Sequence, residues 1–94
     1  MDDDIEMRRK RALYRATHRG TKELDVMIGG FARAHLQNFS AAELAVFENL
    51  LVLQDPSLQA WILEGKPAGF PEFAPLIDDI RVFHGLAACR RVAH

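Results

Sequence analysis

The chain has 94 residues, 49% of them hydrophobic and 27% charged, with a formal net charge of −1 at pH 7, which fits one globular domain with a modest core. A net charge this small argues against partners recognised by overall charge, such as nucleic acid or a membrane surface. No apolar run approaches about 18 residues and the N-terminus is acidic, so we expect no membrane insertion, no targeting segment and a cytoplasmic location.

Helix-favouring residues predict a first helix over Ile5 to Thr17. Asp3 and Glu6 have the spacing of a capping box, in which each side chain bonds the backbone of the other residue. The side chains expected to face the core are Leu13 and Ala16, with Tyr14 beside them.

The charge along this segment is uneven, with acids at its start and bases after them. The acids are Asp2, Asp3, Asp4 and Glu6. The bases are Arg8, Arg9, Lys10, Arg11, Arg15, Arg19 and Lys22. This order suits the helix dipole and predicts a solvated helix whose arginines stay in water. The alternative is a nucleic-acid or phosphate patch, but no known nucleic-acid motif accompanies the basic residues.

Gly20 interrupts the first helical pattern and suits either a helix C-cap or a helix N-cap, because glycine tolerates positive φ. As an N-cap it would make Glu23 the third helical residue, whose carboxylate can reach back to a free N–H. A second helix is predicted over Thr21 to Leu36, and the Gly29-Gly30 pair inside it indicates close approach of another helix or a bend. Its apolar stripe is Leu24, Met27, Ile28, Phe31 and Ala34.

Two helices are predicted next. Ser40-Ala41-Ala42-Glu43 is a capping box that starts the third helix, which should end near Leu53. Asp55-Pro56 has the residue types of an N-cap and first helical position for a fourth helix, which Gly65 ends. The expected buried side chains of these two helices are Leu44, Val46, Phe47, Leu50, Leu51, Leu58, Trp61 and Ile62.

A fifth helix should begin between Pro71 and Pro75, end at His84 and be capped by Gly85. The side chains expected inside are Phe73, Leu76, Ile77, Ile80 and Phe83, and those expected outside are Asp78, Asp79 and Arg81. No segment alternates like a strand and the links are short, so the predicted fold is a compact all-α, antiparallel five-helix bundle. We expect a single domain over residues 1–94, with an ordered core over about 5–84 and a tail over 85–94 that extends the last helix or frays.

No group of side chains predicts an enzyme. Cys89 is the single cysteine, so no internal disulfide can form. The histidines lack metal-ligand spacing, so we expect no metal site. Asp78 and Asp79 are neighbours on a helix and point in different directions, so they do not form a working carboxylate pair.

The strongest candidate site is the segment from Arg19 to Asp25. It places one guanidinium and the carboxylates of Glu23 and Asp25 beside Gly20. One interpretation is a well-capped corner between two helices, and the short motif alone favours it. The other is a rigid corner that offers directional, charge-assisted hydrogen bonds to a partner.

The sequence resembles the SdhE-type succinate dehydrogenase assembly factors, small flavinylation factors of bacteria with mitochondrial relatives. The resemblance is carried by RRKRALYRATHRGTKELD (residues 8–25), LQDPSLQAWI (residues 53–62) and Gly65-Lys66-Pro67. Their order and spacing match the family over roughly residues 8–83. Two departures are Ser57, where the family commonly has an acid, and the bulkier loop Gly69-Phe70-Pro71.

This resemblance implies a five-helix assembly chaperone rather than an enzyme. Similar proteins bind the flavoprotein subunit of succinate dehydrogenase, and sometimes that of fumarate reductase, and promote covalent attachment of FAD to a histidine of that subunit. The FAD is attached to the partner, so the chain itself is expected to hold no cofactor stably and to be a monomer when free. The alternative is a generic helical adaptor or antitoxin-like regulator that binds a different partner regardless of flavin status.

The family motif carries over onto Arg19, Gly20 and Glu23, and Asp25 continues it. The resemblance implies that Arg19 and Glu23 make polar contacts with the flavoprotein and that Asp25 supports them or orients Arg19. The resemblance also implies that Gly20 lets the partner surface approach the backbone. The residues expected to extend this surface are Tyr14, Arg15, His18 and Lys22. Arg11 and Lys22 are expected at its rim, where charge affects the association rate more than the affinity.

Overall fold

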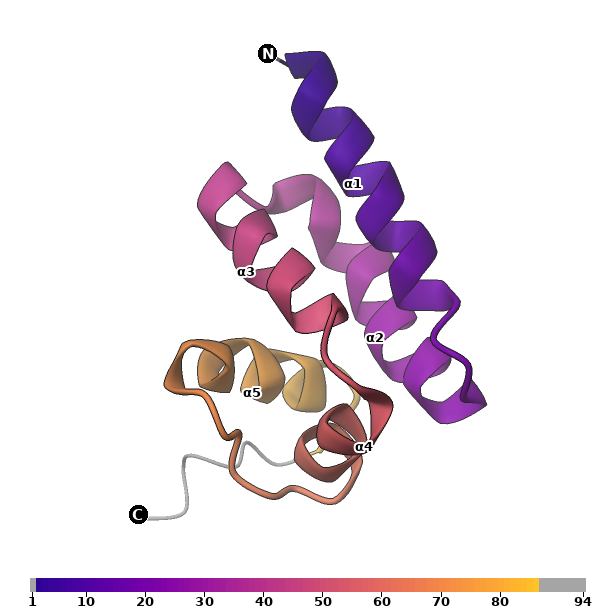
Figure 1. Ribbon diagram of the computed structural model, residues 1–94, viewed down its shortest axis with the longest axis vertical. Coiled ribbons are helices and arrows are strands. Elements are labelled where there is room, and N and C mark those ends of the chain that lie inside the picture. The colour runs from indigo at the N-terminus through magenta and orange to yellow at the C-terminus, as the bar shows by residue number, and fades with distance from the viewer. Residues whose placement is uncertain (1, 87–94) are drawn as a thin grey trace.

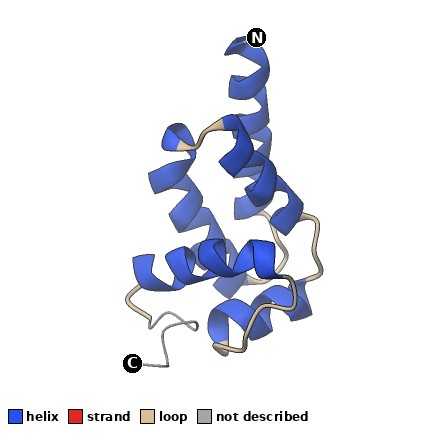
Figure 2. Ribbon diagram, turned by 90° about the vertical axis from the view of Figure 1, so that its left-hand side faces the viewer, coloured by secondary structure: helices blue, strands red, loops and turns tan. Residues whose placement is uncertain are grey.

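The computed structural model describes residues 2–86, which form five α-helices and contain no strand (Figures 1 and 2). This confirms the predicted all-α, five-helix fold. The α-helices are α1 (Asp2–Thr17), α2 (Lys22–His35), α3 (Ala41–Leu51), α4 (Asp55–Leu58) and α5 (Ala74–Phe83). Short turns of other helical types are η1 (Leu36–Asn38), η2 (Gln59–Leu63) and η3 (Pro71–Phe73). Within residues 2–86, every helix is too short or too polar to span a bilayer. Cys89 and most of the predicted tail lie outside the described residues.

The long helix α1 lies along α2, and a glycine sets how close the two come (Figure 1). A Cβ added to Gly29 would lie 2.8 Å from Thr17 Cγ2, a distance too short for two carbon atoms that are not bonded to each other. Of the two readings of the Gly29-Gly30 pair, close approach of another helix is therefore the right one. The buried side chains of α1, Ala12 and Ala16, are small for the same reason.

Three expectations for α1 were wrong. The helix begins at Asp2, so Asp3 does not cap it, and Glu6 forms an ion pair with Arg9 at 2.9 Å instead. Tyr14 is 63% exposed rather than core-facing.

The arginines of α1 also do not all stay in water. Nε and Nη2 of Arg8 donate to Glu48 of α3 at 3.2 and 2.8 Å. Nε and Nη2 of Arg9 donate to the carbonyls of Leu36, the first residue of η1, and Phe39, which follows η1, at 3.1 and 2.9 Å. The long arginine side chains reach backbone and side-chain acceptors that only the folded chain brings near.

The capping signals of the later helices are mostly confirmed. The Ser40 hydroxyl accepts from Glu43 N–H at 3.2 Å and the Glu43 carboxylate accepts from Ser40 N–H at 2.8 Å, so the capping box is complete. Gly65 and Gly85 have φ of +76° and +83° and end their helices as predicted. Helix α3 ends earlier than expected, at Leu51.

The fourth helical segment differs from the prediction at its start and in its second half. Gln54 is its N-cap, so Asp55 is the first helical residue and its carboxylate is used elsewhere. After Leu58 the chain widens into the π-helical turn η2, in which Glu64 N–H donates to Gln59 O, five residues back. This wider turn still buries Trp61 and Ile62, as the sequence predicted.

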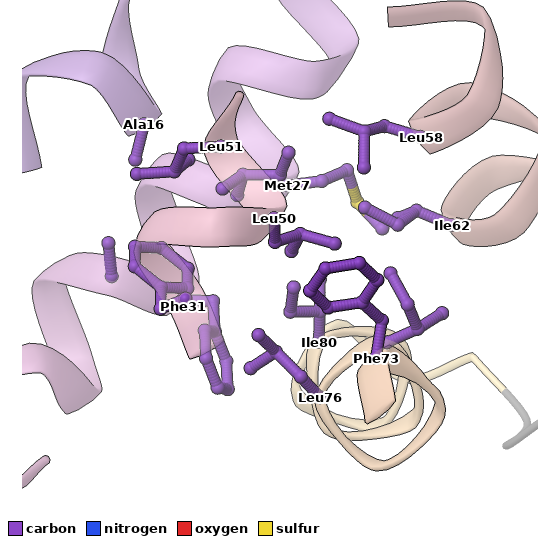
Figure 3. Close-up of a cluster of buried hydrophobic side chains, with 14 of the residues drawn as sticks. Ala16, Met27, Phe31, Leu50, Leu51, Leu58, Ile62, Phe73, Leu76 and Ile80 are labelled. Atoms are coloured by element: carbon purple, nitrogen blue, oxygen red, sulfur yellow. The ribbon is translucent and has the colours of Figure 1, made fainter. Parts of the chain in front are cut away.

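One hydrophobic core joins all five helices (Figure 3). Its fully buried large side chains are Leu24, Ile28, Leu44, Phe47, Leu50, Leu58, Ile62, Ile77 and Ile80. On α2, Ala32 is buried and Ala34 exposed, the reverse of the predicted stripe, because α1 packs on the side of α2 that carries Gly29. On α5, Asp78 is 4% exposed and Phe83 44% exposed. The sequence predicted Asp78 outside and Phe83 inside, and both predictions were wrong. The buried side of α5 is wider and differently placed because α5 packs against α2 and η2 together.

Candidate functional site

The corner between α1 and α2 is formed by residues 18–21 and contains a glycine with a left-handed backbone. Gly20 has a φ of +110°, and it is exposed. Thr21, not Gly20, is the N-cap of α2, and its hydroxyl accepts from Leu24 N–H at 3.4 Å. Glu23 is therefore the second helical residue rather than the third, and its carboxylate does not close a capping box at Gly20.

The Arg19 side chain turns inward and ties this corner to the link between α3 and α4. Nε and Nη2 of Arg19 donate to Oδ1 of Asp55 at 3.1 and 2.7 Å. Nη2 also donates to the carbonyl of Leu53 at 2.6 Å, and Nη1 donates to the carbonyl of Leu51. The Arg19 side chain is only 10% exposed. We call this group of Arg19, Leu51, Leu53 and Asp55 the Arg19 clasp.

Asp25 holds the same residue from the other side. Its Oδ1 accepts a hydrogen bond from the backbone N–H of Arg19 at 2.5 Å. Asp25 thus supports Arg19 through the main chain, whereas Asp55 fixes the guanidinium. Because both the backbone and the side chain of Arg19 are bound within the chain, the corner has a defined shape before any partner arrives.

An open groove of about 750 Å³ lies beside the clasp, between the end of α1 and the α3–α4 link. Its lining residues are Tyr14, Arg15, His18, Arg19, Leu51, Val52, Leu53, Gln54, Asp55 and Pro56. We call it the corner groove. The rings of Tyr14 and His18 stack at its edge with centroids 4.1 Å apart, and His18 Nδ1 lies 2.8 Å from the carbonyl of Tyr14. Val52 is 69% exposed on the other wall.

The structure divides the predicted site residues into three groups. The groove is lined by Tyr14, Arg15, His18 and Arg19. Exposed at the corner, outside the groove, are Gly20, Lys22 and Glu23. Asp25 is half-buried beneath them. That any of these residues touches a partner stays a prediction.

Sequence reasoning missed the second wall of the groove, which includes Val52, Gln54 and Pro56. The signal for Gln54 and Pro56 was the LQDPSLQAWI segment, residues 53–62, which carried part of the family resemblance but was assigned no site residue. The two motif segments meet because the Arg19 clasp joins them. Among the described side chains, no cluster of three or more His, Cys, Asp or Glu residues could hold a metal ion.

Comparison with known proteins identifies the family. A family model described as the flavinator of succinate dehydrogenase matches residues 10–84. The chain is 36% identical over 88 residues to the FAD assembly factor SdhE of Acetobacter pasteurianus. This match covers 89% of this chain and 81% of that protein. No solved structure matches the chain.

Mitochondrial proteins match over a shorter part. The chain is 38% identical over 68 residues to succinate dehydrogenase assembly factor 2-A of Drosophila sechellia, and 37% identical over 68 residues to factor 2-B of Drosophila persimilis. These matches cover 70% of this chain but only 42% and 43% of the fly proteins. The chain therefore spans less than half the length of these mitochondrial relatives. The family match from residue 10 to 84, together with identity over most of the bacterial relative, shows that this chain belongs to the flavinators of succinate dehydrogenase.

Proposed function

We propose that this chain is an assembly chaperone that binds the flavoprotein subunit of succinate dehydrogenase and promotes covalent attachment of FAD to it. The observation that carries the proposal is the family match over residues 10–84, which includes the corner, the clasp and all of α2 to α5. In this role the FAD becomes attached to the partner, and the chain supplies a binding surface rather than a catalytic group.

Such a chaperone works by binding one conformation of its client better than the others. If the conformer that is competent for flavin attachment is rare, preferential binding raises its population relative to the others, at most by the ratio of the affinities for the two conformers. A rigid surface suits this task, because less conformational freedom is lost on docking. The Arg19 clasp and the hydrogen bond from Arg19 N–H to Asp25 provide that rigidity.

Within the corner we assign different roles to the motif residues. Glu23 is exposed and, among the described residues, its carboxylate has no hydrogen-bond or ion-pair partner, so it is free to accept hydrogen bonds from the flavoprotein. Gly20 is exposed and lets a partner surface approach the main chain. Arg19 acts mainly by holding the corner in shape. A cytoplasmic location, a monomeric state and service to fumarate reductase stay predictions.

The test is covalent flavin in the succinate dehydrogenase flavoprotein, measured as in-gel fluorescence after denaturation, with and without this chain. We expect the signal to depend on the wild-type chain and to fall with Glu23→Ala. Glu72→Ala, which removes another exposed glutamate far along the chain, is the matched control and should support the wild-type signal. Fluorescence that is the same without the chain would overturn the proposal, and full activity of Glu23→Ala would remove Glu23 from the site.

A further inference from the structure

The corner groove continues along α1, away from Gly20. A second groove of about 240 Å³ lies between α1 and α3 and shares Arg15, Leu51 and Val52 with the first. Its lining residues are Arg11, Ala12, Arg15, Glu48, Asn49, Leu51 and Val52. We call this second groove the α1–α3 seam. Because the two grooves share a wall, a segment that enters the corner can continue along the seam.

Among residues 2–86, the seam has more positive charge than its own acid can pair. Its acid, Glu48, is already paired with Arg8 at 2.8 Å. Arg11 and Arg15 are both exposed, and among the described side chains neither has a hydrogen-bond or ion-pair partner. Their charges still reach Glu48, since they add to the effect of the Arg8 hydrogen bond in lowering the pKa of that carboxyl. Two unpaired guanidinium groups therefore lie one helical turn apart along the groove.

Exposed apolar surface lies next to these charges. Val52 is 69% exposed and lines both grooves, and Tyr14 is 63% exposed at the corner end. Arginine and aromatic side chains around an apolar patch are enriched at protein–protein interfaces. Nucleic-acid binding depends on cations that neutralise phosphates, whereas the carboxylate of Glu48, which lines the seam, would repel a phosphate.

We propose that the α1–α3 seam binds an acidic segment of the client protein, in which two carboxylates pair with Arg11 and Arg15 and an apolar side chain rests on Val52. Arginines four apart on a helix have Cβ atoms about 5–6 Å apart. Acidic residues at alternate positions of an extended segment, about 6–7 Å apart, match that spacing. The inference rests on the proposed function, because the client is taken to be the flavoprotein subunit.

The first test is the affinity of the purified flavoprotein subunit for charge-reversed variants. The double variant Arg11→Glu/Arg15→Glu reverses the seam. The double variant Lys10→Glu/Arg33→Glu makes the same change in net charge at exposed residues that line neither groove. At about 0.05 M salt we expect the seam variant to bind roughly tenfold or more weakly than the control variant, and we expect the difference to shrink at about 0.5 M salt.

The second test locates the carboxylates. The double variant Arg11→Lys/Arg15→Lys keeps the charge and supplies primary amines, which a carbodiimide joins directly to a carboxylate in contact with them. Peptide mass spectrometry should show cross-links from positions 11 and 15 to aspartates or glutamates of the flavoprotein. The native Lys10 of the same molecule is the internal control and should give none.

The outcomes separate this inference from the function on which it rests. Seam and control variants that bind the flavoprotein equally well, while the wild type binds it, would overturn the seam and leave the proposed function standing. Absence of binding by the wild type would overturn both. If the seam variant instead lost affinity only for a mixed-sequence RNA oligonucleotide and kept its affinity for the flavoprotein, the seam would belong to nucleic acid and the inference would be wrong.

Discussion

Asp55 and Arg19 are 36 residues apart in sequence, yet Oδ1 of Asp55 accepts hydrogen bonds from both Nε and Nη2 of Arg19. The other carboxylate oxygen, Oδ2, lies 3.7 Å from the place where a Cβ of Gly20 would be. Asp55 thus lies between the side chain of the motif arginine and the backbone of the motif glycine. This arrangement makes the stability of the corner a property that can be measured separately from client binding.

Removal of the Arg19 side chain should destabilise the fold. We expect Arg19→Ala to lower the free energy of unfolding by about 2–4 kcal/mol, because Asp55 and two backbone carbonyls lose a charged donor in a largely buried place. Arg19→Lys keeps the charge but not the planar fork and should lose about half as much. Urea unfolding monitored by circular dichroism measures both. Glu6→Gln, which breaks the exposed Arg9–Glu6 pair, is the control and should change stability by less than about 0.5 kcal/mol. An Arg19→Ala protein as stable as the wild type would contradict the clasp.

Two substitutions of Gly20 should separate backbone strain from obstruction of the partner. Any L-residue is strained at a φ of +110°, so Gly20→Ala and Gly20→Arg should each cost about 1–2 kcal/mol of stability. The alanine methyl has ordinary van der Waals space, with its nearest neighbour at 3.7 Å, so Gly20→Ala should still support flavin attachment. Gly20→Arg should fold but should not support flavin attachment, because its long charged side chain would obstruct the partner surface. The measurements are urea unfolding and in-gel flavin fluorescence. Equal loss of fluorescence in both variants would make the glycine purely structural.

The sign of a Gly29→Ala change should depend on Thr17. Alanine favours a helix over glycine by about 1 kcal/mol, but here its Cβ meets Thr17 Cγ2 at 2.8 Å. That methyl cannot move easily, because the Thr17 hydroxyl is bonded to the carbonyls of Leu13 and Tyr14.

We therefore expect Gly29→Ala alone to destabilise by about 1–3 kcal/mol. In a Thr17→Ser background, which removes Cγ2 and keeps the hydroxyl, the same change should be neutral or stabilising. A double-mutant cycle of urea midpoints gives the coupling, and identical effects in the two backgrounds would show that the contact is relaxed at no cost.

The Arg8–Glu48 pair predicts a pH dependence of stability. The hydrogen bond from Arg8 lowers the pKa of Glu48 in the folded chain below its unfolded value, which is about 4.3. The stabilisation is therefore fully present above that value and is lost as the pH falls through the folded pKa. The difference in free energy of unfolding between wild type and Glu48→Gln should shrink as the pH is lowered from 7 to about 3. In an Arg8→Gln background the pH dependence should be weaker, and a constant difference at every pH would contradict the assignment.

Signals that act within a few residues could be predicted from the sequence. The Ser40–Glu43 capping box, the glycine helix ends and the buried Trp61 need only local spacing and polarity, and the structure confirms them. The faces of Asp78 and Phe83 could not be predicted in the same way. Their exposure depends on which neighbours cover α5. The period of the hydrophobic residues shows which side of the helix faces the core, but it does not show how wide the covered surface is.

For the candidate site, the motif segment was visible in the sequence, but the roles within it were not. Charge and spacing cannot distinguish the buried guanidinium of Arg19 from the exposed one of Arg15, because the acceptors of Arg19 are 32–36 residues away. Val52 gave no signal, since an exposed valine after a helix is recognised as part of a groove only when the opposite wall is known.

The long sequence separation within the Arg19 clasp also has a consequence for the order of folding. Closing a chain segment of more than 30 residues costs more entropy than forming a helical turn, so contacts of this kind form late, after the local helices. A nascent or truncated chain that lacks the α3–α4 link contains the whole corner motif but cannot give it its final shape. Under the proposed function, the surface offered to a client is thus completed only when the chain is fully folded, and a chain that lacks the α3–α4 link should bind the client more weakly.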